Sequence, residues 1–280
     1  MTVWNMMNKE SYAPIIIIAV VVVVVLGGWL FISNSSGVNP PFTVIESHSM
    51  QHCQEEDRHS ELGVIDTGDM ILVKSKDKCD IVSYVDGSKT GYKTFGDYGN
   101  VIVYYRDSGN PVIHRAFLWL QYNGDGTWSA PSLDGYSRYW ECSTGITDYN
   151  KLSGTLTFKE VGVVVEGGKT LTINLSNLPH TSGFLTVGDS VSNMYFDQST
   201  SISSSLVSME KIKSVAWKEI PWLGSIKLML NGHTSELNNW ASNSKTMIAE
   251  LIVTMILVVI AAGCLIDEIR FVRHRSEEDN

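Results

Sequence analysis

Residues 100–120, NVIVYYRDSGNPVIHRAFLWL, decide the fold class of this chain. Two apolar runs, residues 100–105 and 111–120, flank the polar segment RDSGN, and this pattern predicts a β-hairpin. The second run carries His114 between apolar neighbours. A histidine in such a strand costs stability unless it is paired, so His114 is either a hydrogen-bonded core residue or part of a functional site.

Shorter strands are expected on both sides of this hairpin. Residues 42–45 and 64–73 have strand character, and the second of these contains Thr67-Gly68-Asp69 as a tight turn. Residues 121–183 are richer in Gly, Ser, Thr, Asn and Trp and contain short alternating runs. That stretch predicts an inserted, mostly β subdomain in a mainly β protein.

Two apolar segments predict membrane-spanning helices. Residues 15–32, IIIIAVVVVVVLGGWLFI, carry no charge and are about as long as a hydrocarbon core is thick. Residues 247–266 carry Glu250 near their start and are otherwise without charge until residue 266. A cleaved signal peptide is the alternative for the first segment. The apolar run is long for that, and no small-x-small exit precedes the polar stretch SNSSGVNPP, so a retained anchor is favoured.

The charge of the tail predicts the orientation of these helices. Arg270, Arg273 and Arg275 follow the second apolar segment, and Lys9 precedes the first. Because positive residues are enriched on the cytoplasmic side, both termini are expected to be cytoplasmic and the residues between the spans extracytoplasmic. Glu250 is expected to lie close enough to the outer interface to reach water.

Net charge and cysteine usage exclude several classes of function. The formal net charge is −9, and no basic stripe is present that could neutralise phosphates, so a nucleic-acid partner is not expected. Cys53, Cys79 and Cys142 fall in the predicted exterior, where one disulfide among them is permitted, and Cys264 falls in the second span. Their spacing matches no zinc framework, but the cluster His48, His52, Cys53 and His59 remains a candidate metal site.

A candidate nucleophile follows the first apolar segment. Residues 44–51, VIESHSMQ, contain Ser49. Serine is a poor nucleophile at neutral pH because its hydroxyl stays protonated, so it needs a base within hydrogen-bond reach. His48 and His52 flank it in sequence, but a neighbour on the same turn usually points elsewhere. His59 lies in a charged loop, and His114 in the predicted hairpin is explained equally well as a satisfied core histidine or as part of a site.

Several short motifs occur in a recognisable order. ESHSM is followed by TGDMILV, VIHRA, FLTVGDSVSNMYFDQ and EIPWLGSIKL. This order resembles the signal peptidase I family in its archaeal and endoplasmic-reticulum branch. The motifs are scattered between Glu46 and Leu228; each is weak by itself, and together they are specific.

The resemblance implies a role for each matched residue. Ser49 matches the nucleophile, and His114 matches the general base, where the bacterial branch has lysine. Two aspartates match the acidic box: Asp197 is preferred as the acid that orients the histidine, and Asp189 is kept as a site-organising residue. The backbone N–H of Ser49 is the first candidate donor to a developing oxyanion. Ser47 resembles the position whose hydroxyl assists in part of the family, and the alternative is that a serine there simply caps the turn.

The chain also departs from the family pattern near these motifs. His48 stands where a small residue is common, Gln51 and His52 replace the usual proline after Ser-Met, and Val187 replaces a lysine. These departures allow a different substrate preference or a loss of activity.

The resemblance also implies an architecture and a function. We expect a signal-peptidase-like antiparallel β catalytic domain that removes signal peptides from exported preproteins at a plasma membrane, without a cofactor. Expected partners are the preproteins, the lipid bilayer and the protein export channel. The alternative is a non-catalytic membrane-anchored β domain that serves as an adhesion module or accessory subunit. The expected divisions are a cytoplasmic N-terminus (1–14), a span (15–32), the catalytic domain (33–120 and 184–230), the inserted subdomain (121–183), a connector (231–246), a span (247–266) and a cytoplasmic tail (267–280).

Overall fold

The computed structural model describes residues 3–53, 57–106, 108–162 and 167–278. The chain divides into two compact units. The first unit comprises Met1–Thr43, Ile71–Asp189 and Met194–Lys218, and the second comprises Val44–Met70, Ser190–Asn193 and Glu219–Asn280. The predicted inserted subdomain, residues 121–183, lies within the first unit.

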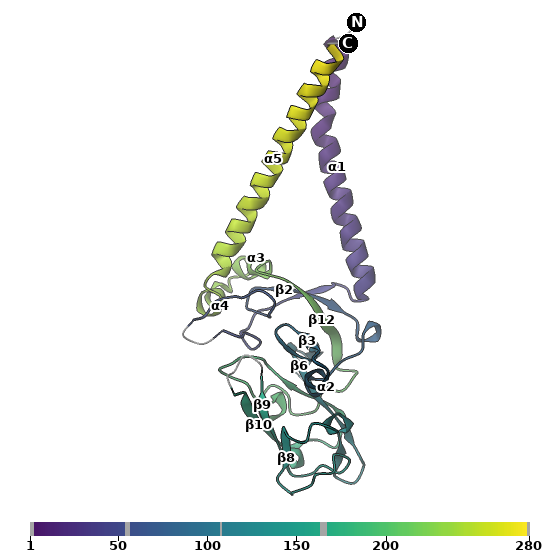
Figure 1. Ribbon diagram of the computed structural model, residues 1–280, viewed down its shortest axis with the longest axis vertical. Coiled ribbons are helices and arrows are strands. Elements are labelled where there is room, and N and C mark those ends of the chain that lie inside the picture. Colours follow the sequence, from purple (N-terminus) through teal and green to yellow (C-terminus); the bar gives the residue numbers. More distant parts are fainter. Residues whose placement is uncertain (1–2, 54–56, 107, 163–166, 279–280) are drawn as a thin grey trace. The chain divides into compact units, whose positions relative to one another are not determined.

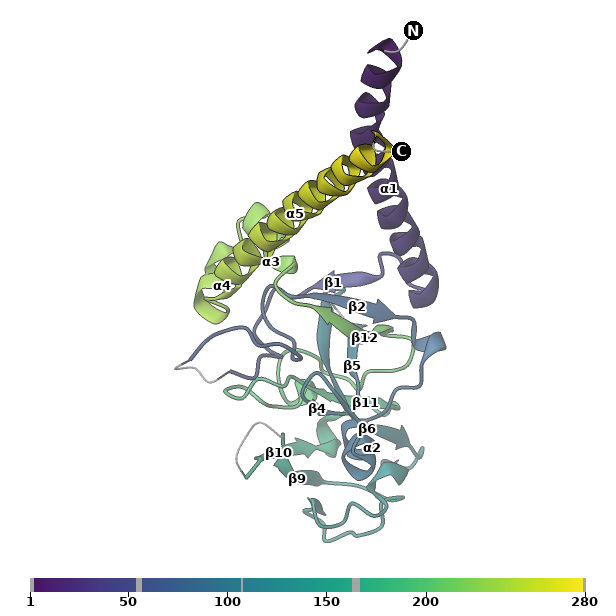
Figure 2. The same ribbon diagram turned by 45° about the horizontal axis from the view of Figure 1, so that its top comes forward.

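A seven-stranded sheet forms the framework of the first unit (Figures 1 and 2). The predicted hairpin is present and antiparallel, with Tyr104 opposite Val112 and Ile102 opposite His114. The fold is mainly antiparallel β, as predicted. In sheet order the strands are β1 (Phe42–Val44), β2 (Met70–Lys74), β12 (Ile212–Ile220), β5 (Val101–Tyr105), β6 (Pro111–Tyr122) and β11 (Gly183–Val187), while β7 (Trp128–Ser129) pairs with β6.

Smaller elements complete the first unit. A three-stranded sheet has the order β10 (Lys169–Asn174), β9 (Thr155–Val161) and β8 (Trp140–Cys142), and β3 (Lys93–Thr94) pairs with β4 (Asp97–Tyr98). The helix α2 (Tyr84–Thr90) is capped at its N-terminus by Ser83, whose hydroxyl accepts a hydrogen bond from the backbone N–H of Asp86. The described part of this unit also contains single-turn 3-10 helices, namely η1 (Lys76–Lys78), η2 (Pro131–Leu133), η3 (Leu175–Asn177) and η4 (Asp197–Ser199).

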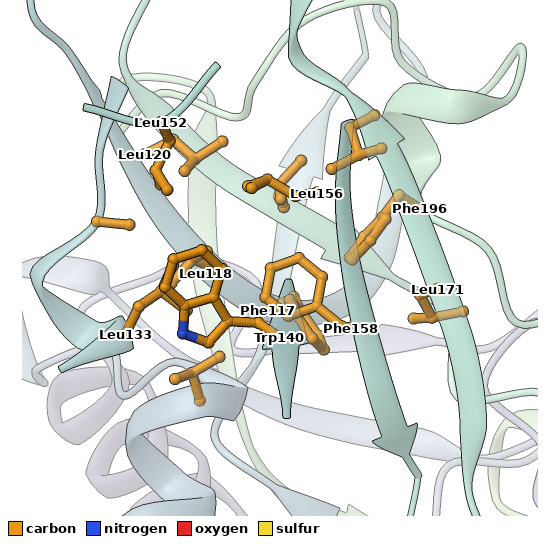
Figure 3. Close-up of a cluster of buried hydrophobic side chains, with 14 of the residues drawn as sticks. Phe117, Leu118, Leu120, Leu133, Trp140, Leu152, Leu156, Phe158, Leu171 and Phe196 are labelled. Atoms are coloured by element: carbon orange, nitrogen blue, oxygen red, sulfur yellow. The ribbon is translucent and has the colours of Figure 1, made fainter. Parts of the chain in front are cut away.

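An apolar core connects the seven-stranded and the three-stranded sheets of the first unit. Phe117 of β6 makes edge contacts with Phe158 of β9 and with Phe196, each with ring centroids 4.9 Å apart. Phe196 immediately precedes η4, so this aromatic cluster fixes the start of that turn. Figure 3 shows these rings among buried leucines from both sheets.

The second unit combines long loops with three helices. These are α3 (Gly224–Leu230), α4 (Thr234–Trp240) and α5 (Ser244–Glu278). The predicted strand at residues 64–73 is shorter than expected and begins at Met70, because the preceding residues form the turn at Thr67 and Gly68. Gly68 has φ +95°, and a β-carbon there would lie 2.4 Å from the Ser225 hydroxyl, so only glycine fits where the turn approaches α3.

Among the residues that the structure describes, two helices are long and apolar enough to cross a membrane. They are α1 (Val3–Ser36), with an apolar window at Ala19–Ser36, and α5, with a window at Ser244–Ala261. Their apolar side chains face outward: Val23 is 68% exposed and Val259 is 71% exposed. Large exposed apolar surfaces of this kind are what a bilayer covers, so both helices are candidate membrane spans, consistent with the predicted segments at 15–32 and 247–266.

Candidate functional site

His114 and Asp197 form a buried pair in the first unit. His114 Nδ1 lies 2.8 Å from each carboxylate oxygen of Asp197. The histidine is 3% exposed and the aspartate is fully buried. This is the geometry in which a carboxylate fixes the tautomer and the orientation of an imidazole ring, with Nδ1 as the donor.

Two hydroxyl groups hold the Asp197 carboxylate from another direction. The Tyr104 hydroxyl donates to Oδ2 at 2.7 Å, and Thr186 Oγ1 donates to the same oxygen at 2.6 Å. Burial raises the pKa of Tyr104, and the nearby charge of Asp197 adds to the effect, so the phenol keeps its proton. The carboxylate therefore accepts hydrogen bonds from three side chains, which fix its position.

Strand register explains why these side chains meet. Ile102 is opposite His114, and Tyr104 lies two residues further along β5, on the same face of the sheet. Thr186 of β11 is opposite Ala116, which lies two residues beyond His114. One face of three adjacent strands thus supplies Tyr104, His114 and Thr186.

Backbone contacts hold Asp197 at the first position of η4. Its carbonyl accepts hydrogen bonds from the backbone N–H of Thr200 at 3.1 Å and of Ser203 at 3.2 Å. The next residue, Gln198, accepts the backbone N–H of Thr186 at 3.1 Å. The position of the acid is therefore fixed by its backbone as well as by its carboxylate.

Asp189 has a different partner. Its carboxylate accepts hydrogen bonds from the buried guanidinium of Arg115, with Nε 2.9 Å from Oδ1 and with Nη2 donating to Oδ2. Arg115 Nη1 also donates to four backbone carbonyls, including Asp97 at 3.2 Å and Gly99 at 3.0 Å. Because His114 and Arg115 are adjacent on a strand, they point to opposite faces, and each takes one of the two aspartates.

Ser49 lies on a turn of the second unit. The backbone N–H of Gln51 donates to the His48 carbonyl at 3.1 Å, which places Ser49 at the first central position of the turn. Met50, 1% exposed, anchors the turn, while Ser49 is half-buried. Ser47 Oγ lies 3.3 Å from Ser49 Oγ, so the two hydroxyls that the sequence singled out are neighbours.

Contacts within the second unit hold the Ser49 turn against the TGD segment and α4. The backbone N–H of Ile45 donates to the Asp69 carbonyl at 3.0 Å, and the N–H of Gly68 donates back to Ile45 at 2.9 Å. The Gln51 amide donates to the Trp240 carbonyl at the end of α4, and its oxygen accepts the Thr67 hydroxyl at 3.3 Å. Gln51 is thus a structural tether between the Ser49 turn, the TGD segment and the end of α4.

Two buried carboxyl groups, those of Asp66 and Asp69, lie at the TGD segment. Asp69 accepts the backbone N–H of Trp222 at 2.9 Å and of Asp66 at 2.8 Å. Burial raises the pKa of Asp66 to about 7 and that of Asp69 to about 8. The pair supports the loop that precedes β2, and its protonation state changes near neutral pH.

The candidate metal cluster of the sequence has other contacts. The ring of His48 stacks on Trp240 with centroids 3.6 Å apart, and His59 contacts Asp57 and Glu61. Throughout the described ranges, no group of three or more His, Cys, Asp or Glu side chains is placed to hold a metal ion. All four cysteines are free thiols, so the disulfide that the sequence permitted is not present.

The comparisons with known proteins give no family for this chain. No protein-family model matches it, and no curated protein matches it.

The structure nevertheless shows which of the residues singled out in the sequence analysis lie together and which do not. His114 and Asp197 are in contact, Asp189 belongs to the Arg115 pair, and Ser47 and Ser49 are neighbours in the second unit. Sequence reasoning missed Tyr104 and Thr186. The alternation of side chains along the hairpin strands was enough information to place Tyr104 on the same face as His114. Placing Thr186 there required knowledge that β6 pairs with β11.

Proposed function

We propose that this chain is a membrane-bound serine endopeptidase that removes signal peptides from exported preproteins, with Ser49 as nucleophile, His114 as general base and Asp197 as orienting acid. The observation that carries the proposal is the buried His114–Asp197 pair with its two hydroxyl donors. A buried histidine can be satisfied by a single neutral acceptor, whereas a carboxylate with three side-chain donors is suited to stabilise an imidazolium.

Each step in the proposed reaction has a residue assigned to it. Ser49 Oγ attacks the scissile carbonyl while His114 Nε2 takes the hydroxyl proton, and Asp197 stabilises the imidazolium that forms. His114 then gives the proton to the leaving amine as the C–N bond breaks, which leaves an acyl-serine. Water attacks the acyl group with His114 again as base, and the carboxylic acid product leaves.

The developing oxyanion needs hydrogen-bond donors. The backbone N–H of Ser49 is the first candidate and the Ser47 hydroxyl is the second. The 3.3 Å separation of the Ser47 and Ser49 hydroxyl oxygens supports the role of Ser47, because it places a donor beside the attacking oxygen.

The two candidate spans support a membrane location. In the proposal both termini are cytoplasmic, as the arginines after the second span indicate, and the β domain lies on the outer side of a plasma membrane. Preproteins that leave the export channel present their cleavage sites at that surface. No cofactor is required by this mechanism.

The direct test is cleavage of a model preprotein by the full chain in lipid, with folding checked by circular dichroism. Ser49→Ala, His114→Ala and Asp197→Ala are each expected to lower kcat by about a thousandfold or more, because the members of a triad act as a unit. Ser201→Ala and His233→Ala, at exposed positions, are the matched controls and should cleave normally.

A second readout separates catalysis from binding. A fluorescent phosphonate should label the wild-type chain and the controls and should fail to label Ser49→Ala. Cleavage by folded Ser49→Ala at the wild-type rate would refute the proposal and would favour the non-catalytic anchored β domain.

A further inference from the structure

The three-stranded sheet of the first unit has an edge that lines a hollow. The strand β10 lies at one end of the sheet order, and among the described residues no strand pairs with its outer side (Figures 1 and 2). A cavity of about 350 Å³ lies beside it, lined by Thr170, Thr172, Asn174, Gln198 and Ser199 among others. The other wall includes η4, the turn that begins with Asp197.

Hydrogen bonding shows which backbone groups face this cavity. Residues of an antiparallel strand alternate between bonding to the neighbouring strand and pointing away from it. The Ser199 hydroxyl donates to the Thr172 carbonyl at 3.3 Å, so Thr172 belongs to the outward set. At two-residue spacing, Thr170 and Asn174 belong to the same set. The side chains of Leu171 and Ile173 are buried and anchor the strand.

We infer that this edge binds an extended, polar polypeptide segment by strand addition, and that the segment is the mature region of the preprotein beyond the cleavage site. The inference rests on the proposed function. Exposed strand edges are templates for pairing with another chain, and strand addition is a common mode of peptide recognition. The lining combines hydroxyl and amide groups with the apolar Leu171, Ile173 and Phe196, which suits a mature segment of mixed composition better than a signal peptide, whose central region is apolar.

The position of the edge relates it to the proposed chemistry. An added strand lies along η4, whose first residue holds His114 and whose last residue is Ser199. Tyr195, 61% exposed, also lines the cavity and offers a ring for packing against a bound side chain. In the free protein the Ser199 hydroxyl donates to the Thr172 carbonyl, so an incoming strand must displace that hydrogen bond.

The test measures binding without cleavage. A fluorescein-labelled mature-segment peptide of about eight residues, long enough to cover a short strand, is titrated into the full-length Ser49→Ala chain in detergent, and binding is followed by anisotropy. In this background Thr172→Pro removes the outward N–H at an edge position where proline is tolerated, so Kd is expected to rise at least tenfold. Thr172→Val is the matched control, because it keeps the N–H and should bind within about twofold of the parent.

Ser199→Ala gives a prediction of opposite sign. It removes the hydroxyl that competes for the Thr172 carbonyl, so Kd is expected to fall about two- to fivefold. Two peptides are compared, one methylated at the odd and one at the even backbone nitrogens. The peptide whose methyl groups occupy the nitrogens that face β10 should lose binding. Unfolding midpoints within a few degrees of the parent confirm that the variants are folded.

The outcomes distinguish this inference from the proposed function. Equal Kd values for the parent and Thr172→Pro, or absence of peptide binding to the parent, overturn strand addition even if the wild-type chain cleaves preproteins. Binding with the expected variant pattern in a chain whose wild type cleaves nothing overturns the assignment of the occupant as substrate.

Discussion

Tyr104→Phe tests whether the hydroxyl donors on Asp197 position the proposed acid. The substitution removes one oxygen atom from a fully buried side chain and leaves the ring in place. Of the donors to the Asp197 carboxylate, His114 and Thr186 remain, so the charge loses one hydrogen bond of 2.7 Å and keeps the others. A hydrogen bond to a charged group contributes about 1.5–3 kcal/mol, and the remaining donors place the expected loss near 1.5 kcal/mol.

That loss predicts both a kinetic and a thermal effect. If the hydroxyl acts by holding Asp197 for the transition state, kcat should fall about tenfold while KM stays unchanged. The unfolding midpoint should fall by about 3–6 °C. Preprotein cleavage at several substrate concentrations and thermal unfolding followed by circular dichroism measure the two quantities.

Tyr105→Phe is the matched control for this prediction. Tyr105 is the next residue of β5, points to the opposite face and is 40% exposed, so loss of its hydroxyl should change neither kcat nor the midpoint. Tyr104→Phe with a wild-type kcat would refute the positioning role. A rise in KM with unchanged kcat would refute it equally, because it would show that the Tyr104 hydroxyl contacts the substrate.

Three further predictions concern the carboxylates. Asp66 and Asp69 have raised pKa values of about 7 and about 8, so the folded chain binds more protons than the unfolded chain between about pH 4 and pH 8. The free energy of unfolding should therefore fall as pH rises through this range. Asp69→Asn should flatten this slope in unfolding measurements across pH, and an unchanged slope would contradict the assignment. Arg115→Met should cost about 3–5 kcal/mol, measured by denaturant unfolding, because it leaves the buried charge of Asp189 unpaired, and a loss below about 1 kcal/mol would show that the charge is solvated. Asp197→Asn should lower kcat by about ten-thousandfold in a folded chain, whereas Asp189→Asn should mainly lower stability; the reverse order in kinetics would assign the acid to Asp189.

Local patterns were enough to predict the hairpin, the two apolar helices and the burial of His114. The hairpin needs only two apolar runs and a turn between them, and its two-residue period also determines which side chains accompany His114. Thr186 and Asp197 could not be placed in this way. Their approach to His114 depends on pairing of β6 with β11 and on an aromatic core formed by distant segments.

The second unit was less predictable for a related reason. Residues 215–229 look like one apolar segment, but β12 ends at Ile220 and α3 begins at Gly224. Trp222, between them, adopts φ +59° and donates its backbone N–H to Asp69, more than 150 residues earlier in the chain. A break determined by a distant carboxylate leaves no trace in local periodicity.

The tether between the Ser49 turn and α4 gives the C-terminal helix a mechanical role. Gln51 is bound to Trp240, and the backbone of residues 58–60 is bound to Ser242 and Asn243, immediately before α5 begins. A chain shortened before Trp240 therefore loses the contacts that support the Ser49 turn as well as its second candidate span. In the proposed membrane-bound protein, tilting of α5 to suit bilayers of different thickness is expected to pull on this same loop and to shift Ser49.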